Sequence, residues 1–156
     1  MYYGIENREH LENEVEDVCN NLGSKPKLSA QMLMETCGAE TQLGTFPDRH
    51  PEKLGVGAFQ FDQIALDDLQ KETDQRHKDK VLALWDYDLD AVELKDLAFD
   101  VKLAAICCRL KYMRIPDAIP TNYMDRASYW KRFYNTEAGK GTVEHYLEAV
   151  ERFKLV

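Results

Sequence analysis

The amino-acid sequence predicts an all-α fold, or nearly so, built as one domain over residues 1–156. Apolar residues recur at helical spacing in several segments, which is the pattern of amphipathic helices. Residues 96–113 are apolar on most of their helical circumference, which is typical of a helix that is buried on all sides. Residues 38–62 lack a helical period and also lack the alternation of a half-buried strand. A chain of this length can bury one core, so we expect a single domain around that central helix.

The first predicted helix covers residues 10–22, where apolar side chains return every three or four positions. A second, shorter helix follows Ser29, a residue type that caps helix N-termini. We expect this helix to end near Cys37, because Gly38 comes next and glycine often terminates helices. The prediction places Glu35 in the last turn of the second helix.

The stretch from residue 38 to residue 62 contains half of the eight glycines and two of the five prolines. We interpret it as a long ordered loop or a small hairpin, a kind of segment that usually has a functional reason. Helices are then expected over about 62–70, 72–85, 96–113 and 122–134, and from Thr142 onward. Pro116 and Pro120 separate the central helix from the next one, because proline cannot continue a helix.

Composition and charge exclude several classes of protein. The net charge is −8 and the estimated pI is 5.0, so the electrostatic footprint of a nucleic-acid-binding protein is missing and we expect no nucleic-acid partner. Basic and aromatic residues gather at 108–116 and 126–134, which we interpret as solvated helix faces. No window approaches the ~18 apolar residues of a membrane span, and no signal peptide is recognisable. We therefore expect no stable membrane insertion and a chain made without its own secretion signal.

Common catalytic and metal-binding motifs do not occur in the sequence. The four histidines form no H-E-x-x-H pattern, and the nucleophile and phosphate-binding motifs G-x-S-x-G and G-x-x-x-x-G-K-[ST] are absent. The stretch from Asp86 starts like a calcium loop, but Ala91 stands where the sharp turn needs glycine. The four cysteines show no C-x-x-C spacing, so we expect reduced, buried thiols. We expect no metal and no cofactor.

Three carboxylates around the glycine-rich stretch suggest glycoside hydrolysis. This chemistry needs one protonated carboxyl group as general acid and, in inverting enzymes, a second, ionised carboxylate that activates water. Glu35 lies among Leu33, Met34 and Cys37, and apolar surroundings raise a glutamate pKa. Asp48 and Asp62 could fold back over the helix end and hold the water. Structural alternatives stay open, because Asp48 suits an ordinary turn and Asp62 suits a helix N-cap.

The same stretch resembles the core of the goose-type lysozymes and the soluble lytic transglycosylases. In that family a Glu-Ser pair ends a helix and a G-x-x-Q-x-D segment follows; here Glu35-Thr36 and Gly57–Asp62 stand in those places. The central helix is similar to the family's buried helix through Ala104-Ala105. Near the C-terminus, Tyr134 and Asn135 match a Tyr-Asn-Gly-x-Gly motif, with an insertion, "TEA", before the first glycine.

The resemblance implies a lysozyme-like fold that cleaves the β-1,4 bond between N-acetylmuramic acid and N-acetylglucosamine in peptidoglycan. It implies Glu35 as general acid, with Asp48 or Asp62 positioning water. It further implies contacts to the substrate from Thr36, Phe59, Gln60, Tyr134 and Asn135. Because aspartates occupy the goose-type positions, hydrolysis is favoured over the formation of a 1,6-anhydro sugar by a lytic transglycosylase. Trp130 could line a saccharide cleft or belong to the core.

The expected partner is the glycan strand of peptidoglycan, bound by a monomer. Because no signal peptide is recognisable, we expect a bacteriophage enzyme made in the host cytoplasm, either an endolysin or a virion-associated lysin. Two alternatives stay open: a lytic transglycosylase on the same scaffold, and a virion component that binds glycan without turnover.

Overall fold

The computed structural model describes residues 1–47, 54–136 and 139–155, and it confirms the all-α expectation. The helices of the described residues are α1 (Arg8–Asn21), α2 (Pro26–Thr41), α3 (Gln63–Glu72), α4 (Gln75–Trp85), α5 (Val101–Met113), α6 (Tyr123–Tyr129) and α7 (Val143–Arg152). Short 3-10 helices lie at η1 (Leu89–Ala91) and η2 (Leu94–Ala98), and a π-helical stretch, η3 (Trp130–Asn135), continues α6. None of the helices described is long and apolar enough to span a membrane.

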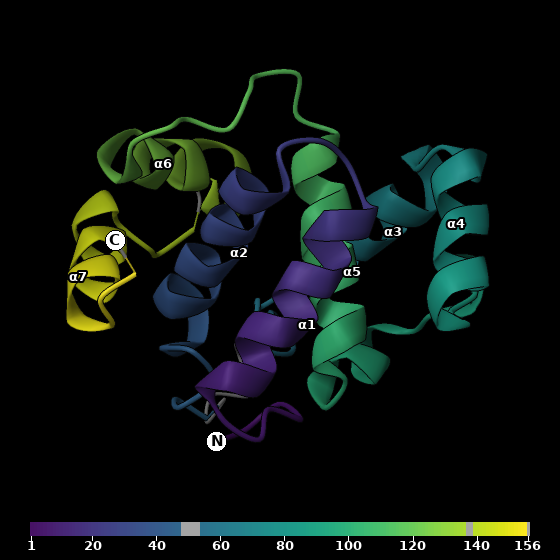
Figure 1. The fold of residues 1–156 in the computed structure, drawn as a ribbon, viewed down its shortest axis with the longest axis horizontal. Coiled ribbons are helices and arrows are strands. Elements are labelled where there is room, and N and C mark those ends of the chain that lie inside the picture. The colour runs from purple at the N-terminus through teal and green to yellow at the C-terminus, as the bar shows by residue number, and fades with distance from the viewer. Residues whose placement is uncertain (48–53, 137–138, 156) are drawn as a thin grey trace.

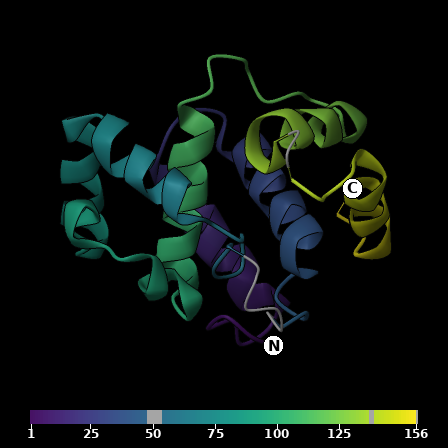
Figure 2. The same ribbon diagram turned by 180° about the vertical axis from the view of Figure 1, so that it is seen from behind.

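Helix α5 is the central helix that the sequence predicts. Ten of its residues are buried. α1 and α2 pack against it on one side in Figure 1, α3 and α4 flank it on a second side, and α6 and α7 lie beyond α2. The view from behind in Figure 2 shows the same order, with α5 between the α3–α4 pair and α2. The two groups of helices therefore share one core, which runs along α2 and α5.

The predicted end of the second helix is wrong. α2 continues through Gly38 to Thr41 and stops where Gln42 and Leu43 adopt left-handed backbone conformations. Gly38 does not end the helix. It allows close packing of α2 against Leu155, because a Cβ there would lie 3.2 Å from a Leu155 methyl group. Glu35 consequently lies inside α2, more than one turn before the end of the helix.

Other boundaries differ from the prediction because polar side chains cap the helices. Asp100 accepts a hydrogen bond from the Leu103 N–H and starts α5 at Val101, so residues 94–98 form a separate 3-10 helix. Asp74 caps α4 in a similar way, so the helix expected over 72–85 begins at Gln75. The helix expected over 122–134 changes to π geometry at Trp130.

After the end of α2, the described part of the glycine-rich stretch forms turns, and the hairpin alternative reduces to one isolated bridge. Val56 and Phe61 exchange two backbone hydrogen bonds of 2.8 and 3.0 Å around the turn that starts at Gly57. Gly57 has φ +81°, and a Cβ there would lie 2.4 Å from the Leu97 carbonyl oxygen. A side chain at this position is therefore excluded on two grounds, backbone conformation and space.

Candidate functional site

Glu35 lies at the centre of a buried polar cluster formed by α2, α6 and α7. Its side chain is 0% exposed. The Arg126 guanidinium donates two hydrogen bonds of 2.7 Å, from Nε to Oε1 and from Nη2 to Oε2. The Tyr146 hydroxyl donates to Oε1 at 2.7 Å, and the Gln31 amide donates to Oε2 at 2.6 Å. We call Gln31, Glu35, Arg126 and Tyr146 the Glu35 cluster.

Three residues of the Glu35 cluster donate four hydrogen bonds to Glu35, which matches the roughly four lone-pair sites of a carboxylate that only accepts hydrogen bonds. Burial acts to lower the pKa of Arg126, but its hydrogen bonds to Glu35 and the charge of that carboxylate outweigh burial, so the pKa of Arg126 is raised. Burial, together with the same carboxylate, raises the pKa of Tyr146 well above its usual value. The sequence predicts apolar surroundings for Glu35; its neighbours along α2 are buried, yet its carboxyl oxygens face polar partners.

The residues that the resemblance assigns to substrate binding fall into two groups by exposure. Thr36, Phe59 and Tyr134 are buried. The Thr36 hydroxyl donates to the Met32 carbonyl at 2.7 Å and lies 2.7 Å from the Tyr112 hydroxyl. The Tyr134 hydroxyl donates to the Phe59 carbonyl at 2.7 Å. In this arrangement these three side chains connect helices and turns within the core.

Gln60 and Asn135 are half-buried and make local contacts. Gln60 has φ +49°, and its amide donates to the Gly57 carbonyl at 2.9 Å. The Asn135 side-chain oxygen accepts a hydrogen bond of 2.8 Å from Lys131 Nζ. Both side chains thus stabilise the turn or helix end on which they lie.

The two aspartates expected to hold water have different outcomes. Asp48 lies outside the described residues. Asp62 is the N-cap of α3, because its Oδ1 accepts a hydrogen bond of 2.8 Å from the Ala65 N–H. The structure therefore shows the capping role for Asp62 that the sequence left open, and its second carboxylate oxygen carries no hydrogen bond among the described residues. Trp130 takes the core alternative: it is 1% exposed and donates from Nε1 to Glu40 at 3.2 Å.

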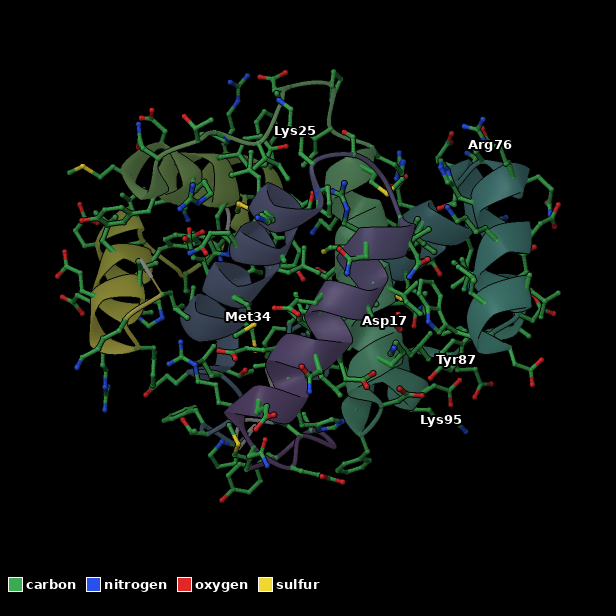
Figure 3. All side chains as sticks on the ribbon, viewed as in Figure 1. Asp17, Lys25, Met34, Arg76, Tyr87 and Lys95 are labelled. Atoms are coloured by element: carbon green, nitrogen blue, oxygen red, sulfur yellow. The ribbon has the colours of Figure 1, made fainter. Side chains whose placement is uncertain are left out.

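A cavity of about 530 Å³ lies beside the Glu35 cluster, between α1, α2 and the C-terminal segment. Gln31 lines this cavity and also binds Glu35, so it forms the wall between the two. Met34, labelled in Figure 3, lies on the same side of α2 and lines the cavity as well. The Leu155 carbonyl accepts a hydrogen bond from the same Gln31 amide, which places the C-terminal segment next to the cluster.

Sequence reasoning missed Arg126 as the partner of Glu35. The sequence grouped Arg126 with solvated basic residues, yet it is 3% exposed. A signal was present, because Arg126 lies three and four positions before two buried aromatic residues and thus on the inner face of α6. Tyr146, the aromatic partner of Glu35, is fully buried on α7.

Within the described ranges, no three His, Cys, Asp or Glu side chains gather as a metal ligand set. All four cysteines are free and buried, as the sequence predicts. Comparisons with protein-family models, with curated proteins and with solved structures find no match to this chain. The fold defines an all-α protein.

Proposed function

We propose that the protein is a peptidoglycan hydrolase, a muramidase that cleaves the β-1,4 bond after N-acetylmuramic acid, with Glu35 as general acid. One observation supports it most: the segments that carry the resemblance contact one another. Thr36 lies against the Tyr112 hydroxyl, the Tyr112 ring stacks on Tyr134 at 5.2 Å between centroids, and Tyr134 binds the Phe59 carbonyl. Motifs far apart in sequence thus meet through Thr36, the residue next to Glu35 in α2.

The proposal requires a change at the Glu35 cluster on substrate binding. In the described conformation all four acceptor positions of Glu35 are occupied, so no face is open to a glycosidic oxygen. Gln31 is the donor whose side chain also lines the 530 Å³ cavity. Displacement of Gln31 would open Oε2 toward that cavity, where Glu35 would take a proton from solvent water and then donate it to the leaving oxygen.

Asp62 is the described candidate for positioning the attacking water. Its Oδ1 caps α3, which fixes the carboxylate without using the second oxygen. Glu35 donates its proton to the glycosidic oxygen as the glycosidic bond breaks. The oxygen of the water then joins the anomeric carbon, and the water gives one proton to the Asp62 carboxylate. In the rival reaction of a lytic transglycosylase, the 6-hydroxyl of the sugar replaces water and the product is lighter by one water molecule.

A second candidate function is a glycan-binding virion component without turnover. The lack of turnover is favoured by the complete burial of Glu35 and by the four hydrogen bonds that occupy its two carboxylate oxygens. In that case the Glu35–Arg126 ion pair connects α2 to α6 and takes part in no reaction.

Clearing of outer-membrane-permeabilised Gram-negative cells separates the two functions. The muramidase proposal predicts that the wild type clears the cells and that Glu35→Gln loses about 10²- to 10⁴-fold in rate, the usual effect of removing a general acid. Glu148→Gln on the exposed side of α7 is the matched control and should keep full activity. Circular dichroism establishes that each variant is folded. A folded wild type that leaves cells and zymogram gels opaque would favour the glycan-binding function.

A further inference from the structure

A second buried arginine, Arg109 on α5, has no acidic partner among the described residues. Arg109 is 4% exposed. Nε donates to the Leu22 carbonyl at 3.1 Å and Nη2 donates to the Ser24 carbonyl at 3.3 Å. None of the ion pairs within the described ranges includes Arg109. The guanidinium thus keeps a full positive charge against neutral carbonyl groups only.

This arrangement is unusual, because a buried charge is costly unless a counter-charge accompanies it. Arg126, the other buried arginine, has the Glu35 carboxylate for that purpose. The backbone also makes room for Arg109: Gly23 has φ +78°, and a Cβ there would lie 2.1 Å from Nη2. Burial lowers the pKa of Arg109, as expected where no carboxylate stabilises the charge.

Arg109 lines a cavity of about 300 Å³ at one end of the molecule. Figure 1 shows that the start of α2, the end of α5 and the loop from residue 114 to residue 122 meet at that end. Apolar side walls come from Ile119 and Tyr129, and Ser29 is a polar lining residue. One carboxylate, Asp117, also lines the cavity and is exposed to solvent.

The start of α2 adds further positive potential to this cavity. The helix begins at Pro26, and no side-chain oxygen caps its first turn. Lys25, the residue before it, has φ +50° and lines the cavity, and Figure 3 labels its side chain at the end of the molecule described above. Uncapped helix N-termini attract anions through their free N–H groups and their dipole. Arg109 and the start of α2 therefore contribute positive potential to this cavity, against the negative potential of the end of α5 and of Asp117.

We propose that this cavity binds an oxyanion, a carboxylate or phosphate group, carried by a small apolar body. The Arg109 guanidinium pairs with the oxyanion, because its fork geometry matches both groups. The apolar walls at Ile119 and Tyr129 cover the attached body. Asp117 opposes the bound charge and weakens affinity without blocking the site. This binding function does not rest on glycan cleavage at Glu35, because neither Glu35 nor Arg126 lines this cavity.

Titration followed by NMR at constant ionic strength tests the proposal, with acetate, butyrate and inorganic phosphate as probes. We expect saturable shifts of the residues around Arg109, with butyrate bound more tightly than acetate because its chain contacts the apolar walls. Whether the carboxylates or phosphate bind more tightly identifies the preferred group. Asp117→Asn should tighten binding, because it removes the opposing charge and leaves the Asp117 carbonyl that accepts from Tyr129.

Arg109→Gln should weaken binding at least tenfold, and Arg76→Gln on the exposed face of α4 is the matched control that should not change it. Because Arg109 also holds the carbonyl after α1, Arg109→Gln could lose its fold. Ile119→Trp gives a second test, since it fills the cavity and leaves Arg109 in place. Absence of saturation by all three probes, or unchanged affinity in folded Arg109→Gln and Ile119→Trp, would overturn the proposal.

Discussion

Replacing Arg126 with methionine tests whether the Glu35 cluster stabilises the fold in the way its geometry indicates. The change keeps an unbranched side chain but shortens it, and it removes the charge together with both hydrogen bonds to Glu35 and those to the Pro120 and Thr121 carbonyls. Glu35 is 0% exposed and would be left as a buried carboxylate with only Gln31 and Tyr146 as donors. Breaking a buried ion pair from one side costs about 3–5 kcal/mol. That is a large share of the roughly 5–15 kcal/mol by which domains are stable.

Urea unfolding, followed by circular dichroism, measures this loss in the free energy of unfolding. Arg132→Met, at an exposed position of η3, is the control and should change stability by less than about 0.5 kcal/mol. The double variant Glu35→Met/Arg126→Met should recover much of the loss, because no unpaired charge remains. A loss below about 1 kcal/mol for Arg126→Met, with an unchanged dependence on urea, would refute the reasoning, since it would mean that Glu35 reaches water or another partner.

Three further predictions concern single features of the structure. Tyr134→Phe leaves the buried Phe59 carbonyl without its donor and should lower the free energy of unfolding by about 1–3 kcal/mol in the same assay. Asp62→Asn should keep the α3 cap, whereas Asp62→Ala should lower the free energy of unfolding by about 1 kcal/mol. If Asp62→Asn cleaves more slowly at unchanged stability, the Asp62 carboxylate acts on the attacking water. Burial raises the pKa of Cys37 and Cys107 to about 12, so iodoacetamide at pH 8 should label these thiols only after unfolding, as mass spectrometry can show; rapid labelling of the folded protein would contradict their burial.

The helices and the core could be predicted from the sequence because their signals are local. The apolar circumference of α5 identifies it as the central helix, and the inward positions of α7 follow from its helical period. Boundaries were less certain, since they depend on caps and on tertiary packing. Gly38 resembles a helix end in the sequence, yet it is a contact point for Leu155, a residue more than a hundred positions away.

The partners of the candidate site could be predicted only in part. The resemblance singles out Glu35, whereas the partners that contact its carboxylate in the structure are Gln31, Arg126 and Tyr146. The pairing with Arg126 depends on the path of α6 across α2, and no pattern along the chain encodes that path. For the same reason, the sequence classed Arg109 with a solvated basic patch, although the close approach of Gly23 allows it to lie inside the protein.

The most direct test of the muramidase proposal is mass spectrometry of the products released from purified peptidoglycan in ¹⁸O-labelled water. The proposal predicts muropeptides that carry one ¹⁸O atom at the reducing end of N-acetylmuramic acid, with release reduced at least about 100-fold by folded Glu35→Gln. Products lighter by one water and free of label would replace hydrolysis by the transglycosylase reaction. Intact peptidoglycan after incubation with the folded wild type would contradict catalysis and leave Glu35 as a structural member of a buried ion pair.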